Sequence, residues 1–268
     1  MRLAFYTYSY TDRLNMPIEP VLERIAAAGY GGIDVSGTHG PSADPNSVTQ
    51  AIRHQTKETT DRLGLRIEAV ITHETLTDSL LSGHPLKLQG SVDLAADLGA
   101  PVVVFHMGGP REGADGHPEM WRRVVDYLKK ALDDAHRRNV KLAVDGIWYG
   151  WIAETPEAFL KLHDDIGSDS FGINYDPCYL TLLGLDPVKV AHLWKGRILH
   201  AHLKDHVGVY PNWEARIPGQ GTMDYARVVG GLHEIGFNEA ISIETFTDMD
   251  FEASCTIGFQ TLSPAVSA

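Results

Sequence analysis

Short apolar runs alternate along the chain with longer amphipathic stretches, and the junction between them recurs. Around residues 18–25 the apolar side chains return at intervals of three and four residues, as on one face of an α-helix. Each such stretch ends at a glycine or asparagine, which tolerates the left-handed backbone that closes a helix. An apolar run of strand length follows at once. The junction residues are Gly29, Gly64, Gly99, Asn139, Gly167, Gly196 and Gly236.

This alternation predicts a parallel sheet, because successive parallel strands need a crossover connection, which a helix supplies. The run at residues 2–8 adds a first strand to those that follow the junctions, which gives eight. Eight such units in 268 residues fit an α/β fold, a single (β/α)8 TIM barrel. An open doubly wound sheet is the alternative, but no glycine-rich phosphate-binding segment follows the first strand. We expect one barrel domain over residues 1–268, with a loose C-terminal tail from about residue 262.

Four of the later predicted strands share one layout. Alternate residues of a strand face opposite ways, so the apolar set of each strand packs under helices and the polar set points into the barrel. Each polar set offers one ionisable residue near the C-terminal end of its strand, which is the end of a TIM barrel where active sites form. These residues are Asp145, Asp176, His202 and Glu244.

Three carboxylates and one imidazole cannot share so small a space as bare charges, because like charges would force proton uptake or require a cation. Oxygen ligands with a single histidine suit Mn²⁺, Mg²⁺, Co²⁺ or Zn²⁺. We therefore expect a divalent cation at the barrel mouth. In the segment HAHLKDH, residues 200–206, His202 is then the ligand, with Lys204 near the mouth and His200 one layer below.

Further patterns are spread over most of the chain. They are AGYGGIDV, NYDPCYLTLLGLDPVKV, ILHAHLKDH followed by IPGQGTMDY, and AISIETF. Together they resemble the xylose-isomerase-like barrel family, which includes ketose 3-epimerases, inosose dehydratases, hydroxypyruvate isomerases, 3-dehydroshikimate dehydratases and apurinic-site endonucleases. The resemblance implies metal ligands at the four strand-end residues and a sugar substrate. Mn²⁺ is the cation that we expect first.

Two positions depart from the family pattern. Asp145 stands where the family usually has Glu, so we expect its shorter carboxylate to reach the metal through water or at a shifted geometry. Tyr179 stands where the epimerases have a histidine that helps to bind substrate. The loop at residues 207–217 also looks longer than in compact epimerases, and its Arg216 is a candidate to cover the substrate.

Other side chains are candidates to line the substrate pocket. His106 ends the strand at residues 101–106, and the resemblance implies that it touches substrate hydroxyl groups; a purely structural histidine is the alternative. Aromatic side chains at a barrel mouth can stack on a sugar ring and exclude water, although they more often serve packing. The other pocket candidates are Tyr6, His39, His73 and Trp148.

Two reactions fit this site. In the first, an isomerase or epimerase acts on a ketose or keto-sugar: Glu244 and Asp145 remove and return the proton beside the carbonyl, and the metal stabilises the enediolate. Lys204 or His106 then stabilises the developing oxyanion. In the second, a β-leaving group departs after the same proton removal, and the protein is a dehydratase or lyase of a keto-sugar or keto-glycoside. The ligands alone do not separate the two reactions.

The composition narrows the partners. A formal net charge of −12 without a Lys/Arg cluster argues against nucleic acid, and so against an apurinic-site endonuclease. No apolar run reaches the length of a membrane span, and two cysteines are too few for a disulfide framework, so we expect a cytoplasmic protein. The expected partner is a small-molecule sugar or sugar derivative. A homo-oligomer is open, since barrels of this family often pair, and an inactive sugar-binding barrel is the non-enzymatic alternative.

Overall fold

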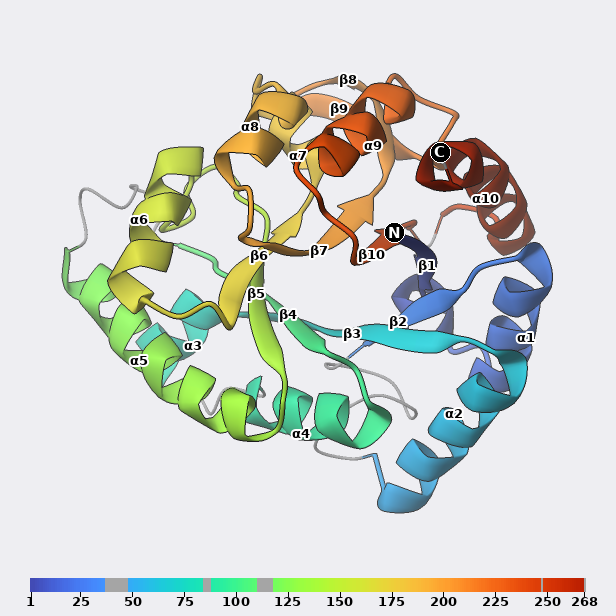
Figure 1. Ribbon diagram of the computed structural model, residues 1–268, viewed down its shortest axis with the longest axis horizontal. Helices are drawn as coiled ribbons and strands as arrows, with labels where there is room; N and C mark the ends of the chain where they lie inside the picture. Colours follow the sequence, from blue (N-terminus) through green and yellow to red (C-terminus); the bar gives the residue numbers. More distant parts are fainter. Residues whose placement is uncertain (37–47, 84–87, 110–117, 247, 268) are drawn as a thin grey trace.

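The strands of this protein close into a parallel barrel (Figure 1). The computed structural model describes residues 1–36, 48–83, 88–109, 118–246 and 248–267. Neighbouring strands follow the order β1-β10-β7-β6-β5-β4-β3-β2, and the eighth closes on the first. This confirms the TIM barrel predicted from the sequence. The strands are β1 (Arg2–Tyr6), β2 (Gly32–Ser36), β3 (Arg66–Thr75), β4 (Val102–His106), β5 (Lys141–Asp145), β6 (Phe171–Tyr175), β7 (Ile198–Leu203) and β10 (Ala240–Ile243).

Helices surround the barrel on its outside (Figure 1). Within the described segments, none of them is both long and apolar enough to cross a membrane. A short π-helix, η1 (Ser9–Arg13), follows β1. The α-helices are α1 (Ile18–Ala28), α2 (Gln50–Leu63), α3 (Leu76–Ser82), α4 (Leu88–Leu98), α5 (Pro118–Arg137), α6 (Pro156–Ile166), α7 (Pro177–Leu182), α8 (Pro187–Leu193), α9 (Tyr225–Glu234) and α10 (Phe251–Ser267).

The last helix corrects one expectation and explains one of the junction glycines. We expected a loose tail from about residue 262, but α10 continues to Ser267, and Leu262 and Val266 are buried in the core. The helix lies beside α1 (Figure 1), where the backbone of Gly29 has a φ of 103°. A Cβ at Gly29 would lie 2.7 Å from the ring of Phe259, so glycine serves both the turn and the close approach of α10.

The apolar core has two layers. The larger layer lies between the strands and the helices, as the outward-facing apolar sets predict. The smaller layer lies inside the barrel and supports the polar residues above it. The residues of this inner layer are Tyr6, Ala69, Ile71, Val102, Val104, Ala143 and Leu199.

A β-bulge in β7 changes which of its side chains face inward. In the pairing with β6, the register shifts between Ile173 and Asn174, which leaves Leu199 as an extra residue. Leu199 therefore joins the inner layer, while Ile198 packs in the outer one. Strict alternation predicted the reverse, and that prediction was wrong because one inserted residue inverts the alternation.

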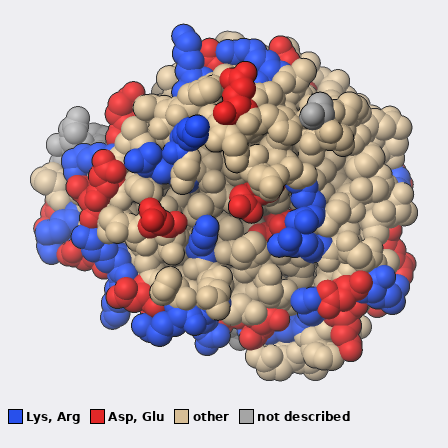
Figure 2. All heavy atoms as spheres, in the orientation of Figure 1, with Lys and Arg blue, Asp and Glu red and all other residues tan. Residues whose placement is uncertain are grey.

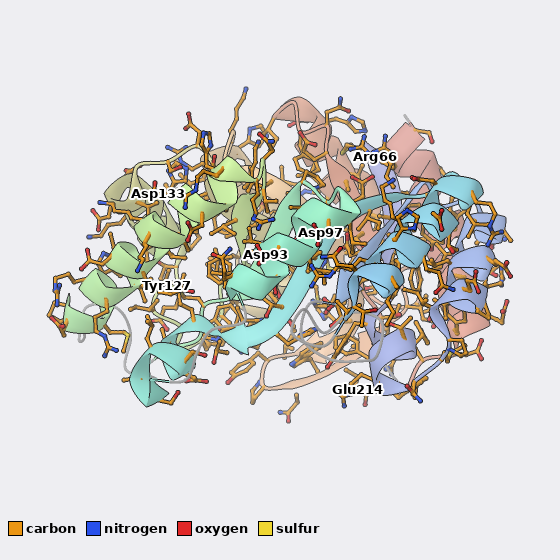
Figure 3. The ribbon with its side chains drawn as sticks, turned by 90° about the horizontal axis from the view of Figure 1, so that it is seen from below. Arg66, Asp93, Asp97, Tyr127, Asp133 and Glu214 are labelled. Carbon is orange, nitrogen blue, oxygen red and sulfur yellow. The ribbon has the colours of Figure 1, made fainter. Side chains whose placement is uncertain are left out.

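The segment after β7 forms a hairpin rather than the loop expected at residues 207–217. Its strands β8 (Asp205–Val209) and β9 (Asn212–Arg216) pair antiparallel. Figure 3 shows Glu214 of β9 and Arg66, at the start of β3, at opposite ends of the molecule. The hairpin therefore stands at the C-terminal end of the barrel strands, where active sites of this fold form.

On the face drawn in Figure 2, Lys and Arg are interspersed with Asp and Glu, mostly around the outer ring. The described residues there form no continuous basic area of the kind that binds a phosphate backbone.

Candidate active site

The strand ends bring the predicted metal-binding residues together around His202. Asp145 ends β5, Asp176 follows β6 and caps the N-terminus of α7, and Glu244 follows β10. His202 Nδ1 lies 3.9 Å from Asp145 Oδ1 and 3.7 Å from Glu244 Oε2. Asp176 joins this group through Lys204, whose ammonium contacts the carboxylates of Asp176 and Glu244. Residues from four strand ends thus form one buried cluster.

A chain of buried polar contacts holds His202 from below. Asp34, on β2, accepts hydrogen bonds from His202 Nε2 at 3.3 Å and from His200 Nε2 at 3.2 Å. His200 Nδ1 lies 2.9 Å from Asn174 Oδ1, and Asn174 Nδ2 donates to Asp145 Oδ1 at 2.5 Å. Asp34 and Asn174 are functional residues that were not predicted from the sequence, although both occupy inward positions of predicted strands.

The surroundings of His202 favour positive charge at its other nitrogen. Nδ1 is buried and has no hydrogen-bond partner among the described residues. Burial alone would lower the pKa of His202, but the hydrogen bond to Asp34 and the charges of Glu244 and Asp145 raise it to about 9. Burial would likewise raise the pKa of Asp34, yet its two histidine partners hold that pKa well below its ordinary value.

These residues fit a divalent cation on the Nδ1 side of His202. Among the described residues, one trio has donor atoms that all lie within 4.8 Å of one another: Asp34, His200 and His202. That trio is sealed from solvent, and its carboxylate already accepts both Nε2–H groups, so an ion there would have to displace two hydrogen bonds. On the Nδ1 side, a lone nitrogen faces Asp145 and Glu244, and Glu244 is 14% exposed. A neutral imidazole held by a carboxylate on its far nitrogen is the usual form of a metal-binding histidine.

Lys204 is more deeply placed than expected. We expected it near the barrel mouth, but its side chain is fully buried, and its ammonium lies 3.9 Å from the centre of the Tyr179 ring. Burial would lower the pKa of Lys204, but the charges of Asp176 and Glu244 raise it well above its ordinary value. Lys204 therefore brings a permanent positive charge to the site.

Three of the other predicted residues, Tyr6, His73 and His106, lie beside the cluster around His202. His106 Nε2 lies 3.0 Å from Asp145 Oδ2, and Tyr6 donates to or accepts from His73 Nε2 at 2.6 Å. The Tyr6 ring stacks on that of His202 with centroids 5.5 Å apart, and His73 stacks on His106 at 5.3 Å. Burial and the neighbouring His106 lower the pKa of His73 to about 4, so His73 is neutral at physiological pH.

The remaining predicted residues have different positions. Arg216 lies on β9, where its guanidinium contacts Glu214 and donates to Ala215 O at 3.0 Å, both in the same hairpin. Tyr179 lies against Trp148, with ring centroids 4.8 Å apart. His39 lies outside the described residues.

A cavity of about 660 Å³ opens beside the site, at the C-terminal ends of β3, β4 and β5. The hairpin tip reaches it through Tyr210. The aromatic part of its lining consists of Trp148, Tyr149, Trp151 and Tyr210.

Comparisons with known proteins agree with this architecture. An inosose dehydratase of Geobacillus kaustophilus is 26% identical over 143 residues, which cover 48% of this chain and 46% of that protein. The chain spans about half the length of the curated relatives it matches.

Two solved structures share the fold. An L-ribulose 3-epimerase has a TM-score of 0.80 at 18% identity, over 99% of this chain and 94% of that one. The IOLI protein with a binding zinc atom has a TM-score of 0.79 at 18% identity, over 100% of this chain and 98% of that one. The family model described as xylose isomerase-like TIM barrel matches residues 22–258. The chain therefore belongs to the xylose isomerase-like TIM barrel family.

Proposed function

We propose that the protein is a divalent-metal-dependent isomerase or epimerase of a ketose or keto-sugar, and that it works through an enediolate. The observation that carries this proposal is the buried Nδ1 of His202, which has no hydrogen-bond partner among the described residues and lies between the carboxylates of Asp145 and Glu244. A bound divalent cation, Mn²⁺ first among the candidates, would supply the positive charge that lowers the energy of the enediolate. His202, Asp145, Glu244 and Asp176 would hold it.

The two acids on either side of His202 would move the proton. Glu244 is the more accessible of the two, and the charges of Lys204 and His202 outweigh burial and lower its pKa, so it is ionised and ready to accept a proton. Asp145 is held by His106 and would return the proton on the opposite side of the substrate carbon. For proton transfer, a carboxylate oxygen of each acid must lie within about 2.6–3.2 Å of the substrate atom that gives or takes the proton, or reach it through one water. Lys204 would stabilise negative charge on the substrate oxygens.

The named relatives support a sugar substrate. One curated relative is an inosose dehydratase and one structural neighbour an L-ribulose 3-epimerase, and both names describe reactions of sugars or polyol ketones. Low identity means that neither name fixes the reaction of this chain.

Elimination is the second candidate, and one observation favours it. The cavity of about 660 Å³ exceeds what a free short ketose would fill, so a keto-sugar with a further substituent fits better. The same proton removal would then expel water or an aglycone, as in a dehydratase or lyase.

Deuterium exchange tests the proposal. A panel of ketoses and keto-glycosides is incubated with the protein and Mn²⁺ in D₂O, the Mn²⁺ is removed by a chelator, and proton NMR spectra are recorded. Exchange without loss of a group indicates epimerisation or isomerisation, and loss of water or aglycone indicates elimination. His202→Ala is the matched control and should show neither. An exchange rate in this variant equal to that of the wild type would contradict the proposal.

A further inference from the structure

The cavity beside the site has an unusual aromatic rim. Tyr149 follows β5 and is 46% exposed, and Tyr210 lies at the hairpin tip and is 44% exposed. Their ring centroids lie 4.5 Å apart, and the Trp148 ring lies 5.6 Å from that of Tyr210. Large aromatic side chains left this exposed around a cavity present ring faces on which a flat ligand can stack.

One part of the cavity lining consists of two backbone segments, those after β4 and β5, which lie in close contact at glycine residues. A Cβ at Gly109 would lie 1.9 Å from Gly150 O, so the segments after β4 and β5 can approach this closely only with glycine at residue 109. Ile152 N donates to Gly108 O at 3.1 Å and ties the two segments together. A lining that is already in place loses little conformational freedom when a ligand binds.

The charge of the described cavity lining indicates whether the ligand is charged. Its described lining includes the carboxylate of Asp78 and no Lys or Arg, so these described residues offer an anionic group repulsion and no charged partner. Its volume of about 660 Å³ lies within the range of roughly 300–1,000 Å³ that is usual for ligand pockets. An uncharged ligand larger than a monosaccharide suits both properties.

The cavity adjoins the candidate active site on two sides. The Trp148 ring lies 4.8 Å from that of Tyr179, which packs on Lys204. The Trp151 ring lies 5.9 Å from that of His106, which contacts Asp145. Trp148 and Trp151 thus line the cavity and also contact residues of the candidate site.

We propose that this cavity is a subsite for an uncharged planar aromatic group joined to the sugar, so that the protein binds aryl glycosides. That the ligand carries a sugar rests on the proposed function. That it carries an aromatic group rests on the lining of the cavity. Stacking on one of the aromatic rings around the cavity adds to the affinity gained from burying the apolar area of the ligand.

The test compares two ligands that cannot react, because neither carries a ketone. Calorimetric titration of the Mn²⁺-loaded protein with phenyl β-glucoside and with methyl β-glucoside gives the contribution of the ring alone. We expect the phenyl glycoside to bind about tenfold more tightly, a difference of about 1.4 kcal/mol. Tyr210→Ala should reduce that preference severalfold and leave the affinity for the methyl glycoside unchanged, and Trp148→Ala should also reduce the preference.

The control variant and a second readout locate the binding. Val209→Ala removes an adjacent hairpin side chain that is 74% exposed and lies outside the described cavity lining, and it should keep the full preference. In nitrogen-15 NMR spectra, the indole signals of Trp148 and Trp151 should shift with the phenyl glycoside, while that of the buried Trp194 should not.

Three outcomes would overturn the subsite. They are equal affinities for the two glycosides, no binding of the phenyl glycoside, and a preference that survives in both aromatic variants. If a second copy of the chain covers the rim instead, sedimentation will show a dimer that Tyr210→Ala dissociates, with no phenyl preference in the wild type. Because the probes do not react, a phenyl preference without deuterium exchange would contradict the proposed reaction alone.

Discussion

At the scale of single residues, alternation along the strands located the inward ionisable groups but not their partners. Asp145, Asp176, His202 and Glu244 could be read from the sequence because each ends a strand whose other face is apolar. Asp34 could not, since its hydrogen bond to His202 joins residues 168 positions apart and exists only because the barrel closes. Its place on a predicted strand gave no sign of this partner.

Asp34 should act on the metal only through His202. We expect Asp34→Asn to lower the affinity for Mn²⁺ by about 10- to 100-fold, because partners that orient a metal-binding histidine typically contribute that much. Calorimetric titration of the metal-free protein measures this directly, and circular dichroism checks that the fold is kept. An unchanged affinity would show that His202 needs no carboxylate to orient it.

Asp145 departs from the family pattern, and its shorter side chain should affect catalysis more than the other departure does. Asp145→Asn should weaken metal binding and abolish deuterium exchange, because the amide is a poorer ligand and no base. Asp145→Glu should keep the metal but lower turnover, since the longer carboxylate displaces the proton-transfer atom from its hydrogen bond with His106. Exchange at the wild-type rate in Asp145→Asn would leave Glu244 as the sole base.

At the scale of elements, the helix–strand units were predicted well and the segment after β7 was not. The junction glycines and the apolar periodicity are local signals, so they can be recognised in the sequence without knowledge of the fold. The β7 bulge and the β8–β9 hairpin depend on which backbone lies opposite. Asp205, the first residue of β8, accepts hydrogen bonds from the backbone of Gly219, Gly221 and Met223.

Asp205 should therefore be needed for the stability of this region. We expect Asp205→Ala to lower the free energy of unfolding by about 1–3 kcal/mol, because partly buried backbone N–H groups would lose their acceptor. Asp205→Asn keeps one acceptor and should cost less. Urea denaturation measures both, and equal stability of Asp205→Ala and wild type would refute the anchoring role.

His206 should be dispensable for catalysis although it is buried. It lies on β8, and its Nε2 lies 3.0 Å from Thr181 Oγ1, away from the cluster around His202. His206→Ala should change turnover by less than about tenfold, or about 1.4 kcal/mol of barrier. A loss of a thousandfold or more in steady-state assays would place His206 in the catalytic machinery.

At the scale of the whole molecule, closure of the barrel is what turns scattered strand ends into one site. The order of the strands brings β5, β6, β7 and β10 together, so Asp145 and Glu244, about a hundred positions apart, both lie close to His202 Nδ1. The sequence predicted this convergence because the TIM barrel fixes where strands end. It could not predict the cavity rim, since Tyr149 and Tyr210 meet only through a hairpin that it read as a loop.

The proposed reaction depends above all on a cation bound on the Nδ1 side of His202. Anomalous diffraction from crystals soaked in Mn²⁺ tests it most directly, because the peak marks the ion itself. The structure predicts one strong peak within bonding distance of His202 Nδ1, Asp145 and Glu244. A peak among Asp34, His200 and the Nε2 of His202, or no peak at full soaking, would contradict it.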